Sequence, residues 1–115
     1  MLLDNICKSY GVRLLTYQNS KDVIQRKLKM KELAARSSGL AAYAGDTPVI
    51  FFDDTRPPVE VDFTIAHELG HIMLGHLSFR RDFGWGMPDS AEREADAFAV
   101  QLLANELRRR YEVPT

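Results

Sequence analysis

The chain has 115 residues, of which 45% are hydrophobic and 27% charged, and its formal net charge at pH 7 is −1. A chain of this length usually builds one hydrophobic core, so we expect a single domain over residues 1–115. The near balance of 15 basic and 16 acidic side chains argues against a protein that binds nucleic acid through bulk charge. The apolar fraction excludes an intrinsically disordered chain.

Cys7 is the only cysteine of the chain, which excludes an intrachain disulfide and a thiolate zinc cluster. We expect its side chain to behave as a small buried apolar group. The first residues carry neither a basic region nor a long apolar stretch, and no segment reaches the length of a membrane span. We therefore expect no signal peptide, no membrane contact and a location in the reducing cytoplasm.

The first third of the chain is its basic part, with 8 basic and 3 acidic side chains over residues 1–36. Its pattern predicts a short helix over residues 2–10 and a strand over residues 12–17. Ser20 can cap a basic amphipathic helix over residues 21–36. The basic face of this helix is either a solvated surface or a docking surface for an acidic or nucleic-acid-bound partner.

The middle of the chain predicts a β-hairpin, because apolar residues 40–44 and 48–52 flank a Gly-Asp-Thr turn. Residues 49–52 either form an exposed edge that pairs with an extended substrate or belong to the core. The next helix is expected over residues 59–74, with Thr55 as its N-cap.

A glycine-rich loop over residues 83–88 precedes the last predicted helix, over residues 89–111. Trp85 lies between two glycines of this loop. It is either an anchor that holds the loop on the core or part of a lid over a substrate, since glycines beside an aromatic residue suit a hinge. The order of helices and strands predicts an α+β fold.

All three histidines of the chain fall within ten residues, and residues 67–71 read H-E-L-G-H inside a predicted helix. Residues four apart share a helix face, so His67 and His71 can bind one metal ion while Glu68 reaches a water molecule beside it. Average residue frequencies make such a pentapeptide a chance event in on the order of a few chains in a thousand. The alternative is that both histidines are polar residues on the exposed side of an amphipathic helix.

A third metal ligand is expected from the last helix, where Glu92 and Glu94 are the candidates. Helical phase favours Glu92, because it shares a stripe with Asp96 and the apolar residues, whereas Glu94 points roughly 160° away. The alternative for Glu92 is a capping-box contact with Asp89. We expect Asp96 to accept a hydrogen bond from the non-ligating ring nitrogen of one of the histidines.

Residues 63–76, followed by residues 92–99, resemble the ImmA/IrrE family of bacterial and phage metallopeptidases. The preceding turn and strand also fit the family pattern, so the resemblance covers roughly residues 38–104. It implies a minimal zincin-like core, in which a small, mostly antiparallel sheet packs on an active-site helix with the H-E-x-x-H motif. A following helix would then carry the third ligand.

The resemblance also implies one Zn²⁺ ion per chain, held by His67, His71 and Glu92, with Glu68 as the catalytic base. The activity that it implies is cytoplasmic cleavage of helix-turn-helix repressors, which relieves repression of DNA-damage genes or mobile elements. The expected partner is thus a DNA-binding repressor as protein substrate, without direct contact to nucleic acid, and a homo-oligomer is compatible with the sequence. We expect selectivity to come from residues 21–36, the Trp85 loop or a partner chain.

The residue that stabilises the oxyanion is open between Tyr43 and His76. His76 can alternatively sit at the helix end, where an imidazolium suits the helix dipole. Two other functions remain as alternatives: a non-proteolytic anti-repressor or antitoxin-like binding module with a structural zinc, and a zinc hydrolase with a non-peptide substrate. Glu68 discriminates between docking and catalysis, because a purely structural zinc site needs no base.

Overall fold

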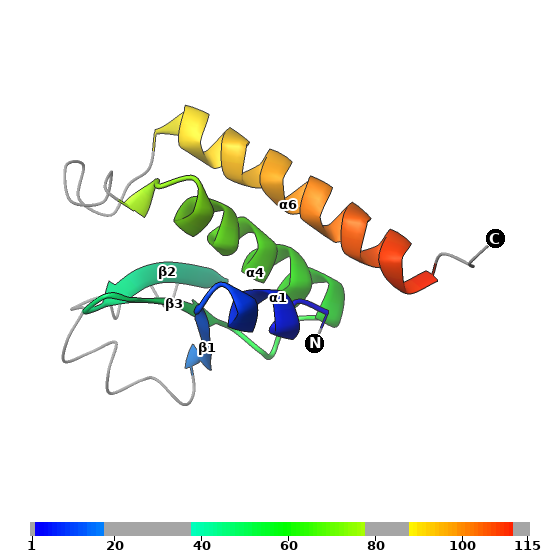
Figure 1. Ribbon diagram of the computed structural model, residues 1–115, viewed down its shortest axis with the longest axis horizontal. Helices are drawn as coiled ribbons and strands as arrows, with labels where there is room; N and C mark the ends of the chain where they lie inside the picture. Colours follow the sequence, from blue (N-terminus) through cyan, green and yellow to red (C-terminus); the bar gives the residue numbers. More distant parts are fainter. Residues whose placement is uncertain (1, 18–37, 78–87, 112–115) are drawn as a thin grey trace.

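The computed structural model describes residues 2–17, 38–77 and 88–111 (Figure 1). The described residues form an α+β fold, as the order of predicted elements indicates. Its elements, in chain order, are α1 (Asp4–Ser9), β1 (Arg13–Thr16), β2 (Gly39–Ala44), β3 (Thr47–Phe52), α4 (Pro58–Met73) and α6 (Asp89–Tyr111). The predicted basic helix over residues 21–36 and the loop around Trp85 lie outside the described residues.

The sheet is mixed, with the strand order β1-β3-β2. Its central strand β3 pairs in parallel with β1, where Leu14 lies opposite Ile50, and antiparallel with β2, where Ala41 lies opposite the same residue. The expectation of a mostly antiparallel sheet therefore holds only for the pair of β2 and β3, because β1 pairs in parallel. Of the two alternatives for residues 49–52, the structure confirms the core and not the exposed edge. Their continuous apolar run is typical of a strand buried on both faces, and all four residues are buried.

The molecule is layered, with α4 lying across one face of the sheet and α6 lying on the far side of α4 (Figure 1). The main core lies between the sheet and α4, where Ile50 meets Ile65 and Leu69. Cys7 belongs to this core and is 1% exposed, which confirms the expectation for its side chain. A smaller cluster covers the opposite face of the sheet. The helix α4 thus packs against the sheet on one side and against α6 on the other.

The start of α4 differs from the expected cap. Its N-cap is Pro57 and Pro58 is the first helical residue, a position that tolerates proline because its missing N–H has no partner there anyway. Thr55 instead donates hydrogen bonds from its backbone N–H and its hydroxyl to the carboxylate of Asp53. The prediction of Thr55 as N-cap is therefore wrong, since the threonine closes a turn two residues earlier.

The contact between α4 and α6 is built from small residues. Ala91, Ala95 and Ala99 of α6 have no exposed surface. On α4, a Cβ atom added to Gly70 would lie 3.1 Å from Cδ1 of Phe98 and 3.3 Å from Cα of Ala95. The two backbones therefore approach closely at the level of the predicted motif.

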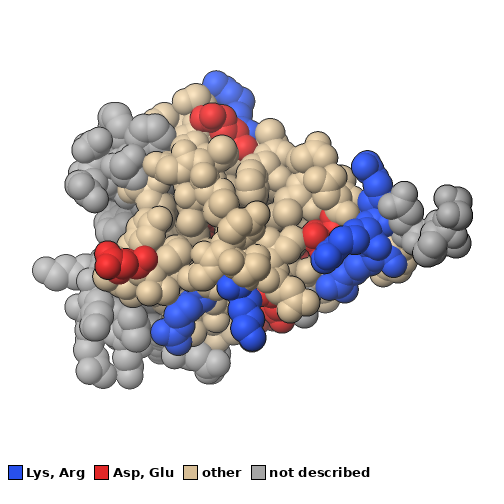
Figure 2. Space-filling view, in the orientation of Figure 1, with Lys and Arg blue, Asp and Glu red and all other residues tan. Residues whose placement is uncertain are grey.

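Arg108, Arg109 and Arg110 follow one another at the far end of α6, where Figure 2 shows one of the groups of basic side chains on this face. The described helices include none with the length and hydropathy needed to cross a membrane. The bounds of α6 coincide with the predicted range, 89–111.

Candidate metal centre

The two histidines of the motif lie one turn apart on the same side of α4. Their neighbours on the helix face the core: Ile65 and Leu69 are fully buried against the sheet. His71 itself is 1% exposed, whereas the side chain of His67 is 16% exposed. The pair of imidazoles thus lies at the border between the core and solvent.

Glu92 reaches both imidazoles from the first turn of α6. Its Oε2 lies 3.1 Å from Nε2 of His67, and its Oε1 lies 3.2 Å from Nε2 of His71. The two Nε2 atoms are 3.1 Å apart. The two imidazoles and the carboxylate, which faces each ring with a different oxygen, therefore form a compact triangle of three groups. The capping-box alternative would place the Glu92 carboxylate on Asp89 instead.

The triangle fits a first-row metal ion such as Zn²⁺. Metal–ligand bonds of about 2.0–2.1 Å in a tetrahedron place neighbouring ligand atoms about 3.3 Å apart, close to the separation of the two Nε2 atoms and to the shortest distance from each of them to the carboxylate. Two imidazoles and one carboxylate are also the donor set of catalytic zinc sites that keep a fourth position open. The distances and the chemistry of the donors both suit such an ion.

Asp96 lies one turn after Glu92 and contacts the other side of the His67 ring. Its Oδ1 is 2.8 Å from Nδ1 of His67. With Nε2 of His67 directed at the triangle, a proton on Nδ1 is donated to the Asp96 carboxylate. This contact orients the ring, as carboxylates behind metal-ligating histidines do.

Glu68 lies between the two histidines in sequence and is 6% exposed. The start of β2 passes close to it: a Cβ atom on Gly39 would lie 3.4 Å from Cγ of Glu68 and would clash with Cγ2 of Thr64. Glycine at position 39 is what lets the strand cross the helix here. The predicted base is thus enclosed by the sheet on one side.

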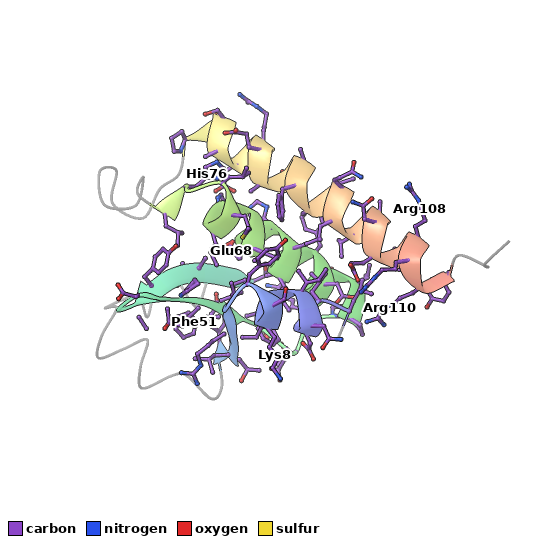
Figure 3. The ribbon with its side chains drawn as sticks, viewed as in Figure 1. Lys8, Phe51, Glu68, His76, Arg108 and Arg110 are labelled. Carbon is purple, nitrogen blue, oxygen red and sulfur yellow. The ribbon has the colours of Figure 1, made fainter. Side chains whose placement is uncertain are left out.

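The third histidine lies at the helix end, which is one of the two placements predicted for it, but its contact with the ring of His71 was not predicted. His76 follows the end of α4, beside the start of α6 (Figure 3), and is 4% exposed. Its Nδ1 is 3.0 Å from Nδ1 of His71, and its Nε2 is 3.4 Å from Oε1 of Glu94. Both ring nitrogens of His76 therefore face protein groups. Tyr43, the other candidate for stabilising the oxyanion, is half exposed on β2 opposite Pro48.

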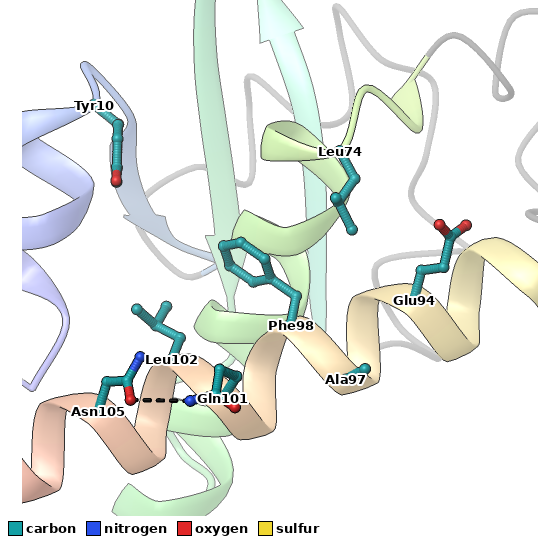
Figure 4. A pocket seen from close by; sticks show the side chains of 8 residues that line it. All are labelled: Tyr10, Leu74, Glu94, Ala97, Phe98, Gln101, Leu102 and Asn105. Atoms are coloured by element: carbon teal, nitrogen blue, oxygen red, sulfur yellow. Dashed lines mark hydrogen bonds between the residues drawn. The ribbon is translucent and has the colours of Figure 1, made fainter.

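Glu94 itself borders a cavity on the other flank of α6. The cavity has a volume of about 560 Å³ and is mostly apolar (Figure 4). Its walls come from α1, the end of α4 and α6, and they are lined by Tyr10, Leu74, Glu94, Ala97, Phe98, Gln101, Leu102 and Asn105. The Glu94 side chain thus lies between the buried ring of His76 and solvent, to which it is 61% exposed.

Comparison with known proteins identifies a family. The sequence model of the Peptidase M78 family, described as the IrrE N-terminal-like domain, matches residues 8–114. No curated protein and no solved structure shows significant similarity to the chain. The match spans every element from β1 to α6 and includes all of the residues in the candidate centre.

Proposed function

The chain belongs to the Peptidase M78 family, the IrrE N-terminal-like domain, and from this premise we propose that it is a zinc-dependent endopeptidase. The family indicates a metallopeptidase-type enzyme. The observation that supports zinc and its ligands is the triangle of His67, His71 and Glu92, whose donor atoms lie 3.1–3.2 Å apart. We assign one Zn²⁺ ion to these three side chains.

Held by His67, His71 and Glu92, a zinc ion would supply the charge that polarises a scissile carbonyl and would lower the pKa of a water molecule to about 7. Glu68, next to His67 in the chain and largely buried, takes the proton of the attacking water and passes it to the leaving amine. Asp96 holds the ring of His67 in the tautomer that directs Nε2 toward the carboxylate of Glu92. Each polar residue of the centre then has a separate task.

The proposed substrate is a helix-turn-helix repressor in the cytoplasm, and its cleavage would relieve repression of stress-response or mobile-element genes. The support for this choice is the family to which the chain belongs. We expect the gene of the substrate beside that of this protein. A small repressor encoded there is the first protein to test.

The deciding experiment replaces the proposed base and keeps the proposed ligands. Glu68→Gln is expected to retain one zinc per chain, measured by elemental analysis, and to abolish cleavage of the repressor, measured by mass spectrometry of the fragments. Glu60→Gln is the matched control, because Glu60 lies two turns earlier on α4 and is exposed. This control should cleave at the wild-type rate.

The same variants separate catalysis from docking. A binding module that displaces the repressor needs no base, so Glu68→Gln would still relieve repression in a reporter strain. Full relief by this variant, with the repressor intact, would show that the protein acts by docking and that the peptidase assignment is wrong.

A further inference from the structure

The end of α4 forms a hydrogen-bonded turn that returns the chain to the metal centre. Gly75 has φ = 75°, a left-handed conformation that favours glycine. The N–H of Gly75 donates to the carbonyl of Ile72 at 3.2 Å, and the N–H of His76 donates to the carbonyl of His71 at 2.9 Å. This pair of bonds is a Schellman motif, which brings the residue after the glycine back against the last turn of its helix.

In most Schellman motifs the side chains that meet across this turn are hydrophobic. Here the two positions are His71 and His76, whose Nδ1 atoms lie 3.0 Å apart and whose ring centroids lie 5.2 Å apart. Both rings are almost fully buried, at 1% and 4% exposure. A buried contact between two ring nitrogens requires that one donates a proton and the other accepts it.

The direction of this hydrogen bond follows from the centre. Nε2 of His71 faces Glu92 and His67 and is therefore the nitrogen that would bind the metal ion. An imidazole that binds a metal ion through Nε2 keeps its proton on Nδ1. His71 is then the donor, and Nδ1 of His76 is the acceptor. The proton of a neutral His76 must lie on Nε2, which faces the carboxylate of Glu94 at 3.4 Å.

We propose that His76 is a positioning residue, which accepts the Nδ1 proton of His71 and so fixes the tautomer and ring orientation of that metal ligand, with Glu94 behind it. The inference rests on the proposed zinc site and adds a residue to it. The two histidine ligands are thereby oriented by different groups: His67 by the exposed carboxylate of Asp96, and His71 by the buried ring of His76. Glu94 contributes less, because its side chain is 61% exposed and water can replace it.

The first test removes and then restores the acceptor. His76→Leu is expected to lower zinc affinity by about 10–100-fold, the usual cost of losing the group behind a metal-ligating histidine. His76→Asn should keep an affinity close to wild type, since Oδ1 of asparagine takes the place of Nδ1. Glu94→Gln should also stay close to wild type. Affinity is measured by competition with a chromophoric chelator, and thermal unfolding of the metal-free proteins reports separately on packing.

The second test needs no substitution, which matters if His76→Leu fails to fold. Long-range ¹⁵N–¹H correlation spectra of the zinc-loaded wild type should place the proton of His71 on Nδ1 and that of His76 on Nε2. A proton on Nδ1 of His76 overturns the proposal, as does unchanged affinity in His76→Leu or an equal loss in His76→Asn. Wild-type protein that takes up no zinc would instead refute the proposed function, and this inference with it.

Discussion

The carboxylates at the two ends of the α4–α6 pair have different partners. Where the end of α4 lies beside the start of α6, the carboxylates of Glu92 and Asp96 lie against histidine rings. At the other end, the largely buried Glu106 forms an ion pair with Arg109 at 2.9 Å. Asp62 of α4 lies near Arg110, which also donates to the backbone carbonyl of Leu2 at 3.3 Å. The second end supplies its own cations.

The two ends differ in the groups that face their carboxylates. Glu106 is largely buried, and a buried carboxylate needs a cation or several hydrogen-bond donors, which Arg109 supplies. The side chains of Glu92 and Asp96 are more exposed, at 45% and 57%, and within the described ranges neither is paired with a lysine or an arginine. Their partners are the ring nitrogens of histidines, and this is the end at which we propose an added cation.

The strongest way to break this comparison is to remove the proposed ligand from α6. Glu92→Gln should lower zinc affinity more than about 100-fold, because loss of a ligand exceeds the 10–100-fold cost of losing a group behind one. Glu94→Gln is the matched control, an exposed glutamate two residues later, and should retain zinc by elemental analysis. The opposite result would move the third ligand to Glu94.

The comparison is sharpened next by moving the two helices apart. Gly70→Ala gains about 1 kcal/mol in helix propensity, but its Cβ would approach Ala95 and Phe98 at 3.1–3.3 Å, and overpacking costs about 1–3 kcal/mol. We expect a net loss of about 1 kcal/mol in the unfolding free energy of the metal-free protein, measured by urea denaturation, together with weaker zinc binding.

The control for this substitution is Ala104→Gly, at an exposed position of α6. It should cost about 1 kcal/mol through propensity alone and leave zinc affinity unchanged. If Gly70→Ala proves more stable than wild type, the close approach of the helices does not limit the site.

The opposite end of the pair is tested by pH. Burial raises the pKa of Asp62 in spite of Arg110 and a hydrogen bond from the backbone of Leu2. A carboxyl with a raised folded pKa contributes stability that is complete below its unfolded value of about 3.9 and is lost as the pH rises through the folded value. Asp62→Asn should therefore gain stability relative to wild type as the pH rises from acid to neutral.

Asp53 is the matched comparison, because its pKa is shifted in the opposite direction to that of Asp62. Hydrogen bonds from the hydroxyl and the backbone of Thr55 lower the pKa of this carboxyl, so its contribution is present above the unfolded value and lost as the pH falls. Asp53→Asn should lose stability relative to wild type as the pH rises. Urea denaturation at several pH values measures both trends, and parallel curves for the two variants would contradict the assigned causes.

The last prediction concerns the chemical reactivity of Cys7, whose buried thiol is uncharged at neutral pH and needs no cation. Burial, and to a lesser extent the charge of Asp4, raises the pKa of its thiol to about 11. Because the thiolate is the reactive form, iodoacetamide should leave the native protein unlabelled at pH 8 and label it in urea, as followed by mass spectrometry. Rapid labelling without urea would show that α1 opens readily.

Features that depend on local periodicity could be predicted from the sequence. The 3.6-residue repeat predicted α6 over its observed bounds. Helical phase predicted that Glu92 rather than Glu94 faces His67 and His71, and its carboxylate lies beside these two rings. The same phase predicted a contact between Asp96 and a histidine ring, and the structure places it on His67. Their roles at a metal ion remain predictions.

Features that depend on contacts distant in the chain could not be predicted in this way. The parallel pairing of β1 with β3 joins strands more than thirty residues apart, and nothing in either strand specifies its neighbour. The contact between His71 and His76 needs the left-handed turn at Gly75. A glycine after the last residue of a predicted helix, followed by a histidine, is the signal that could have revealed this contact.

The alanines of α6 have a consequence for anyone who transplants this centre into another scaffold. Ala91, Ala95 and Ala99 supply no ligand atom, yet their small side chains let the two backbones approach closely, and this distance decides whether the glutamate can reach both rings. A design that copied only the histidines and Glu92 onto helices separated by leucines would leave the carboxylate short of both rings. A transplanted centre must therefore reproduce the spacing of the two helices as well as the ligands.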